Sequence, residues 1–269
     1  MAQVQKLADR YGLSLLPEIH ADYSEKIYEK LAQKGYMTYD FFLPGLVIDA
    51  LESGSGKYLV AWASELREKD IRVVNMLGCH DGIPLLDLRG LLPEERIEKL
   101  IWTVVDRGGM VKNLHGQKNV YYQVNATYYS ALGENDRKLL LARALQLFMP
   151  GKPQVWYLDL LAGNNDYEAV KRAGAGGHKE INRTSLKLSE AKAALKKEVV
   201  RKQLMLLKFR RRFPAFGFDA EFTVSAEGTG ICFVWKKEGC EAMLTADLSD
   251  YSFEISTKTG EKSVIMFRE

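Results

Sequence analysis

The chain has 269 residues, of which 46% are hydrophobic and 27% are charged, which is the usual composition of a soluble globular protein. Its 38 basic residues are nearly balanced by 35 acidic residues, so the net charge of +3 provides no large field to attract nucleic acid. The length is sufficient for one large domain or two small ones with a core of useful size.

Apolar runs alternate with helical periodicity through residues 1–213. Residues 1–12 resemble the last turns of a helix. After them, the pattern predicts a strand at 13–19, a helix at 22–34, a strand at 36–43, helices at 45–53 and 58–69, a strand at 71–77, helices at 93–106 and 134–149, a strand at 153–159 and a long helix at 189–212. Apolar strands that alternate with helices indicate a parallel sheet of βαβ units.

Two segments between these elements lack a clear period. Residues 108–127 are rich in Gly, Asn and Tyr, and we expect them to be irregular. Residues 162–184 are glycine-rich and polar, and a loop of this length is uncommon unless it is functional. After Pro214 the pattern changes to half-buried strands of a small antiparallel β domain. These strands are expected at 219–226, 230–236, 240–247, 251–256 and 263–267.

The parallel part is incomplete as a barrel, because a closed (β/α)₈ barrel needs eight strands and the pattern supplies about four. A doubly wound sheet is disfavoured because the glycine fingerprint after its first strand is missing. Polar residues at strand ends are where barrel enzymes place their chemistry. Here the strand ends carry Glu18, Asp40, His80, Asp81 and Asp159.

Glu18 and Asp81 each follow a predicted buried strand. Taken singly, such a carboxylate is more often a loop residue or a helix cap than a catalytic group. Two strand ends that converge on one mouth would place both carboxylates on one substrate, which is the minimal equipment for cleaving a glycosidic bond. The apolar neighbours Leu16 and Ile19 would raise the pKa of Glu18 and favour it as the proton donor.

The stretch from Leu13 to about Phe216 resembles the sucrose phosphorylases of glycoside hydrolase family 13, within the α-amylase superfamily. The matching pieces are LLPEIH (15–20), YDFFLPGL (39–46), CHDGI (79–83), YYQVNATYYSALG (121–133), PGKPQVWYLDLLAGNND (150–166) and EINRT (180–184). The resemblance implies an α/β fold: the C-terminal half of a (β/α)₈ TIM barrel, then a small antiparallel β domain. The implied parts are a partial barrel at 1–82, an insertion subdomain with an acceptor-site loop at 83–133, the rest of the partial barrel at 134–213, and the β domain at 214–269.

The same resemblance implies roles for individual residues. Glu18 matches the general acid/base, and Asp81 matches the carboxylate that stabilises the transition state. The residues that match positions binding the sugars or phosphate are His80, Arg183, His20, Tyr122 and Gln123. For Tyr122, ordinary packing is an equal alternative.

The loop that precedes Arg183 departs from the common family pattern Gly-Arg-Asp-Ile-Asn-Arg. Here residues 177–183 read Gly-His-Lys-Glu-Ile-Asn-Arg, which places His178 and Lys179 on the acceptor side. Cations there would favour a phosphorylated or carboxylated acceptor, such as sucrose 6′-phosphate or glucosylglycerate. Equally, both side chains are ordinary solvated loop residues.

A larger departure concerns the nucleophile, which in this superfamily is an Asp in an Arg-x-Asp pattern at the end of the strand before the acid/base. No Arg-x-Asp occurs in the sequence. We therefore expect a fragment of a retaining phosphorylase that acts on sucrose or a related α-glucoside with inorganic phosphate, gives glucose 1-phosphate, and is inactive alone. Three alternatives remain: a half that works with a separately encoded N-terminal half, a non-catalytic carbohydrate-binding remnant, and a hydrolase or transglycosylase of the same family.

The chain gives no sign of a cofactor. Cys79, Cys232 and Cys240 follow no metal-ligand spacing, and their odd number disfavours a disulfide framework. No apolar run approaches the roughly 18 residues of a membrane span, and the first residues lack the apolar core of a secretory signal. We expect a cytoplasmic protein without a metal or other cofactor, and without nucleic-acid or membrane partners.

Overall fold

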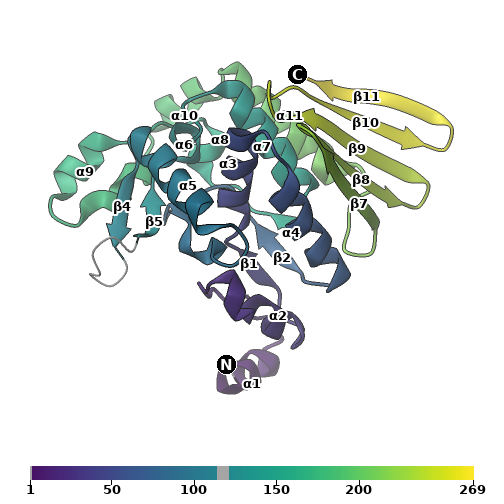
Figure 1. Cartoon of the computed structure of the whole chain (residues 1–269), viewed down its shortest axis with the longest axis horizontal. Helices are drawn as coiled ribbons and strands as arrows, with labels where there is room; N and C mark the ends of the chain where they lie inside the picture. Colours follow the sequence, from purple (N-terminus) through teal and green to yellow (C-terminus); the bar gives the residue numbers. More distant parts are fainter. Residues whose placement is uncertain (1, 114–120) are drawn as a thin grey trace.

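The computed structural model describes residues 2–113 and 121–269, with side chains described for 3–111 and 123–269. A parallel sheet lies at its centre, in the order β1-β2-β6, and consists of β1 (Thr38–Asp40), β2 (Val73–Asn75) and β6 (Lys152–Pro153). Helices connect and cover these strands (Figure 1). Parallel strands need such crossovers, so the alternating pattern in the sequence correctly predicted a parallel α/β fold.

The helices that were predicted lie close to their expected positions, whereas α6, α8 and α9 of the following list were not predicted. The helices are α1 (Ala2–Arg10), α2 (Ile27–Ala32), α3 (Leu43–Ser53), α4 (Lys57–Glu68), α5 (Glu94–Asp106), α6 (Tyr128–Ala131), α7 (Asp136–Phe148), α8 (Tyr157–Leu160), α9 (Tyr167–Ala173), α10 (Leu188–Ala194) and α11 (Glu198–Arg212), with short 3₁₀ turns η1 (Tyr23–Glu25), η2 (Leu86–Leu88) and η4 (Gly177–Asn182). Helix α3 ends where predicted, because Gly54 adopts the left-handed conformation that closes a helix. The predicted helix 189–212 is divided into α10 and α11.

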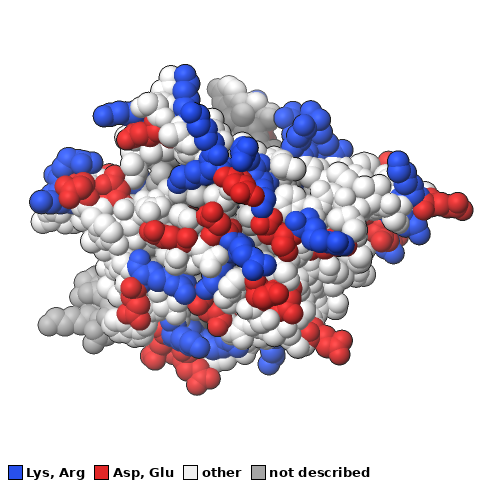
Figure 2. Space-filling view, turned by 90° about the horizontal axis from the view of Figure 1, so that it is seen from above, with Lys and Arg blue, Asp and Glu red and all other residues white. Residues whose placement is uncertain are grey.

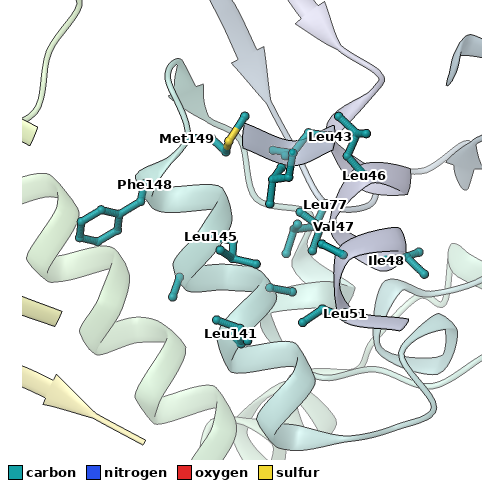
Figure 3. Close-up of a cluster of buried hydrophobic side chains, with 14 of the residues drawn as sticks. Leu43, Leu46, Val47, Ile48, Leu51, Leu77, Leu141, Leu145, Phe148 and Met149 are labelled. Carbon is teal, nitrogen blue, oxygen red and sulfur yellow. The ribbon is translucent and has the colours of Figure 1, made fainter. Parts of the chain in front are cut away.

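The core lies where α3 packs against α7 (Figure 3). Leu46, Val47 and Leu51 on α3 and Leu141 and Leu145 on α7 are buried. Helix α7 is buried on nearly all sides, including its polar Arg143 and Gln146. A helix with so little exposed surface is a central element of the domain, not a surface one.

Of the four strands predicted in the parallel part, 36–43 and 71–77 are shortened to β1 and β2, and the other two are absent or nearly so. Residues 13–19 form no strand, and Leu13 and Leu16 are exposed, although the composition of the segment is that of a buried strand. A strand exists only through ladder hydrogen bonds to a neighbour, and within the described residues this segment has none. The predicted strand 153–159 is also mostly absent: β6 ends at Pro153, and Asp159 lies in helix α8.

The two segments that we expected to be irregular contain regular structure. A second sheet, ordered β3-β5-β4, joins β3 (Ile83–Pro84), β4 (Met110–Asn113) and β5 (Tyr121–Asn125) in antiparallel fashion. The long polar loop 162–184 contains α9 and η4. The glycines in this segment interrupt any helical period, so the sequence pattern did not predict α9 or η4. The division of the chain at residues 82, 133 and 213 stays a prediction.

The predicted C-terminal β domain is confirmed as a five-stranded antiparallel sheet in the order β11-β10-β9-β8-β7. Its strands are β7 (Glu221–Glu227), β8 (Gly230–Lys237), β9 (Cys240–Asp247), β10 (Phe253–Thr259) and β11 (Lys262–Arg268). The sheet packs against the helical part (Figure 1), where Trp235 Nε1 donates to the carbonyl oxygen of Phe148 at 2.8 Å. Lys202 of α11 pairs with the Glu269 side chain at 2.7 Å.

Among the described residues, no helix is long and apolar enough to cross a membrane. The face of the molecule in Figure 2 carries interspersed blue and red side chains and no broad area of one sign. This distribution agrees with the near balance of charges in the sequence.

Candidate active site

The loop that follows β2, residues 78–82, is fixed by close backbone packing. The amide of Gly78 donates to Asp159 Oδ2 at 2.9 Å, and a Cβ atom at Gly78 would lie 2.8 Å from that oxygen. Gly82 has a φ of +101°, and a Cβ there would lie 2.7 Å from the carbonyl oxygen of Val124. Only glycine fits these two positions, so the close packing at Gly78 and Gly82 restricts the backbone conformation of the loop.

Asp81 is the centre of a cationic cluster formed by this loop and η4. Lys179 Nζ donates to Asp81 Oδ1, and Arg183 Nη2 lies 3.2 Å from the same oxygen. His80 Nε2 lies 3.4 Å from Asp81 Oδ2, and Arg183 Nε donates to the His80 carbonyl oxygen at 2.8 Å. Two segments about 100 residues apart in sequence therefore assemble four of the predicted site residues.

The carboxyl group of Asp81 is kept ionised by these neighbours. Partial burial alone would raise its pKa, but the hydrogen bond from Lys179 and the charges of Lys179, His80 and Arg183 outweigh burial and hold the pKa below its usual value. The negative charge on Asp81 is therefore present at neutral pH, as stabilisation of a positively charged transition state requires.

The backbone of Asp81 is held by two amides of strand β5. Gln123 Nε2 and Asn125 Nδ2 each donate to the Asp81 carbonyl oxygen at 2.6 Å. Gln123 is buried, and its amide nitrogen positions the loop, while its role at the acceptor stays a prediction. The side chain of Tyr122, the neighbouring prediction, lies outside the described residues.

The predicted acceptor-side residues lie on two different elements. His178 is half-buried in η4, next to Lys179. His20 lies beside the residues that follow β1, where its ring stacks on Phe41 with centroids 3.8 Å apart and Nδ1 is 3.1 Å from Asp87 Oδ2. His178 thus lies in the same 3₁₀ turn as Lys179, whereas His20 contacts Phe41 and Asp87.

Glu18, like His20, makes no described contact with the cluster around Asp81. Its side chain is exposed, on the segment 13–19 that forms no strand. Within the described part of the chain its carboxylate makes no hydrogen bond or ion pair. His80 and Asp81 thus lie together, and the prediction that Glu18 and Asp81 converge on one substrate stays a prediction.

Sequence reasoning overlooked the residues that support the site. Asn182 Nδ2 donates to the Cys79 carbonyl oxygen at 2.7 Å, Trp156 Nε1 donates to the Asn182 carbonyl oxygen at 3.3 Å, and Asp159 holds Gly78. Asn125 and Asn182 are completely buried. For Asn125 the available signal was an amide between the apolar neighbours Val124 and Ala126, since a buried polar side chain must have a partner.

Replacing Lys179 with alanine is expected to raise the pKa of Asp81, because the substitution removes the largest contribution that opposes burial. The measurement is a pH titration of the Asp81 side-chain carboxyl carbon by NMR, in the wild type and the variant. Lys187→Ala, on an exposed residue outside the cluster, is the matched control and should leave the titration unchanged. An unchanged midpoint in Lys179→Ala would show that the pair is not formed in solution.

Comparison with known proteins gives a consistent result. No protein-family model matches the chain. A sucrose 6(F)-phosphate phosphorylase of Ilumatobacter coccineus is 50% identical over 94% of the chain, and one of Thermoanaerobacterium thermosaccharolyticum is 38% identical over 92%. The crystal structure of a sucrose 6F-phosphate phosphorylase from Thermoanaerobacter thermosaccharolyticum matches 98% of the chain with a TM-score of 0.89 and 35% identity.

The chain belongs to the sucrose phosphorylase-like enzymes of glycoside hydrolase family 13. The family resemblance seen in six pieces of sequence is thereby confirmed. The chain spans about half the length of the curated relatives it matches, 50% and 51% for the two relatives above. A hydrolase from Arthrobacter globiformis, at 14% identity and a TM-score of 0.57, shares the fold alone.

Proposed function

We propose that this chain supplies the sugar-binding and acid/base side of a retaining glucoside phosphorylase. The reaction transfers a glucosyl group from sucrose or a related α-glucoside to inorganic phosphate and gives glucose 1-phosphate. The observation that carries the proposal is the ionised Asp81, fixed after a parallel strand and contacted by Lys179, Arg183 and His80. This sheet end is where α/β enzymes of the barrel class carry out their chemistry.

Each residue has a distinct role in the proposed reaction. The charge of Asp81 stabilises the oxocarbenium-like transition state, and His80 and Arg183 hold the glucosyl hydroxyls. Glu18 protonates the departing oxygen and then removes a proton from the incoming phosphate. Glu18 lies on the segment 13–19, whose Pro17 and Ile19 line a small cavity with Thr38 and Tyr39 of β1, and in the proposed reaction its carboxylate faces the same substrate as Asp81.

The nucleophile is supplied from outside the printed sequence in this proposal. A retaining mechanism needs a carboxylate that forms a covalent glucosyl intermediate, and the family pattern Arg-x-Asp is absent. We accordingly propose that the chain corresponds to the C-terminal half of a (β/α)₈ barrel and its β domain, and that it is inactive alone. The parallel order β1-β2-β6 and the half-length matches support this assignment.

For the acceptor, we propose a phosphorylated fructosyl group, as in sucrose 6′-phosphate. Lys179 and the adjacent His178 lie at the Asp81 cluster, and cationic side chains recognise phosphate through charge-assisted hydrogen bonds. Both relatives described above carry the name sucrose 6(F)-phosphate phosphorylase. A substrate phosphate would compete with Asp81 for the Lys179 ammonium group.

The test combines the purified chain with the polypeptide that makes up the remaining half of the Ilumatobacter relative. We expect glucose 1-phosphate to form from sucrose 6′-phosphate only when both polypeptides and inorganic phosphate are present, and faster than from sucrose. Release of free glucose without dependence on phosphate would support a hydrolase instead. Sugar binding by calorimetry, with no turnover in the mixture, would support the non-catalytic remnant.

A further inference from the structure

Strand β5 presents two amide side chains to one carbonyl oxygen. Gln123 and Asn125 are two residues apart, so their side chains lie on the same face of the strand. Each amide nitrogen lies 2.6 Å from the carbonyl oxygen of Asp81. A carbonyl oxygen only accepts hydrogen bonds, so the nitrogen of each amide is the atom that faces it. Two donors on one acceptor fix the plane of the peptide bond that follows Asp81.

The backbone amide of Asp81 is also bonded to a side chain. It donates to Sγ of Cys79, two residues earlier in the same loop, at 3.3 Å. Among the described residues, both polar groups of the Asp81 backbone therefore bond to side chains and not to a strand ladder. The loop forms only a turn at His80 and Asp81, so these side chains set the direction in which the Asp81 carboxylate points.

Asn125 is the more rigid of the two amides. It is completely buried, and its side chain has one rotatable bond fewer than that of Gln123. The backbone packs closely around it, because a Cβ atom at Gly82 would lie 3.0 Å from both Cα and Nδ2 of Asn125. Strand β5 is itself paired on both sides, with β3 and with β4. A short buried side chain on such a strand is a precise support for a functional group.

The Asp81 carboxylate is held from two directions. Strand β3 directly follows the loop 78–82, so β5 supports both the Asp81 carbonyl and the segment into which the loop continues. The ion pairs of the carboxylate come instead from η4 and the residue after it, through Lys179 and Arg183. A displacement of the loop from β5 would therefore move the carboxylate away from these cations.

We propose that Asn125 is a positioning residue for the glucosyl transfer. Through the backbone carbonyl of Asp81, it sets the orientation of the carboxylate that stabilises the transition state. In this role Asn125 acts through Asp81 and makes no contact with the substrate of its own. The inference rests on the proposed function for the role of Asp81, whereas the effect of Asn125 on the Asp81 carboxyl group is measured in the chain alone.

The first experiment is an NMR titration of the Asp81 carboxyl group in the whole chain alone. Asn125→Ala should raise the midpoint of this titration, because a displaced loop weakens the contact with Lys179 that holds the pKa of Asp81 low. Asn164→Ala removes an exposed asparagine and is the matched control, which should leave the midpoint unchanged. An unchanged midpoint in Asn125→Ala would overturn the inference.

The second experiment uses the enzyme completed with the remaining half of the Ilumatobacter relative. Asn125→Asp keeps the shape of the side chain but places a carboxylate oxygen where the donor was. At pH 7 we expect kcat to fall by a factor on the order of 100, with KM for sucrose 6′-phosphate changed less than about threefold. Burial raises the pKa of the introduced carboxyl group, and its protonated form donates again. The ratio of the variant's kcat to that of the wild type should therefore rise as the pH is lowered.

Asn164→Asp is the control for this series and should give a ratio close to one at every pH. Wild-type kinetics in Asn125→Asp, a kcat that does not recover at lower pH, or a raised KM with kcat unchanged would each overturn the inference. An inactive wild-type mixture would refute the proposed function. The titration in the chain alone would then decide the inference: a raised midpoint in Asn125→Ala sustains the positioning contact, and an unchanged midpoint removes it.

Discussion

Replacing Asp81 with asparagine is expected to lower the rate of glucose 1-phosphate formation by the completed enzyme by a factor on the order of 10³. Asparagine has nearly the same shape, so the loop 78–82 keeps its anchors through Gly78 and the Asp81 backbone carbonyl. The substitution removes the negative charge that faces the developing oxocarbenium ion. It also leaves Lys179 and Arg183 without their carboxylate, which increases the positive charge at the site.

The measurement is kcat and KM for sucrose 6′-phosphate, because a loss of transition-state stabilisation lowers kcat as well as kcat/KM. Asp70→Asn is the control, since Asp70 is an exposed carboxylate paired with Arg72 at 3.5 Å, and it precedes β2 whereas the loop 78–82 follows that strand. A decrease of less than tenfold in the Asp81 variant, with folding intact, would show that Asp81 binds substrate without taking part in the chemistry.

Replacing Arg143 with alanine is expected to lower the free energy of unfolding by about 3–5 kcal/mol. The guanidinium is completely buried on α7, where Nε donates to Gln203 Oε1 at 2.9 Å and Nη1 donates to Gln146. Burial lowers its pKa to about 10, so the group stays charged at neutral pH and interacts favourably with the carboxylate of Asp159. Removing the side chain leaves a cavity. It also leaves the buried Gln203, Gln146 and Asp159 without the partner that the guanidinium provides.

Urea denaturation at pH 7 measures this effect. Arg137→Ala removes an exposed arginine from the same helix and should change the free energy of unfolding by no more than about 0.5 kcal/mol. Arg143→Met restores most of the volume but no hydrogen bond, so it should remain clearly destabilised. Wild-type stability in the methionine variant would contradict the assignment, because packing alone would then account for the role of Arg143.

The same buried network connects stability to the site. Burial raises the pKa of Asp159 to about 6, opposed by Arg143 and by the amide of Gly78. A carboxyl with a raised folded pKa loses native-state stability as the pH rises from its unfolded value, near 4, to about 6. Arg143 lessens that loss, so the Asp159 anchor of the loop that carries His80 and Asp81 depends on a buried side chain of α7.

The amino-acid sequence by itself determined most helices, the parallel α/β class and the five C-terminal strands. These features depend on local period and capping: the apolar positions of α4 and α5 recur at helical spacing, and Gly54 closes α3. The residues of the candidate site were also indicated, because His80, Asp81 and Arg183 lie in recognisable pieces of sequence.

Only the tertiary structure decided which of these residues meet. Lys179 and Arg183 reach Asp81 from a segment that periodicity described as a loop, and Asp159, predicted at a strand end, lies in α8 beneath Gly78. Residues 13–19 show the limit most clearly, since their composition is that of a strand but a strand requires a hydrogen-bonded neighbour. Composition and period are properties of a single segment and can be read from its sequence. Ion pairs and sheet ladders join two segments, so they become visible only when the chain is folded.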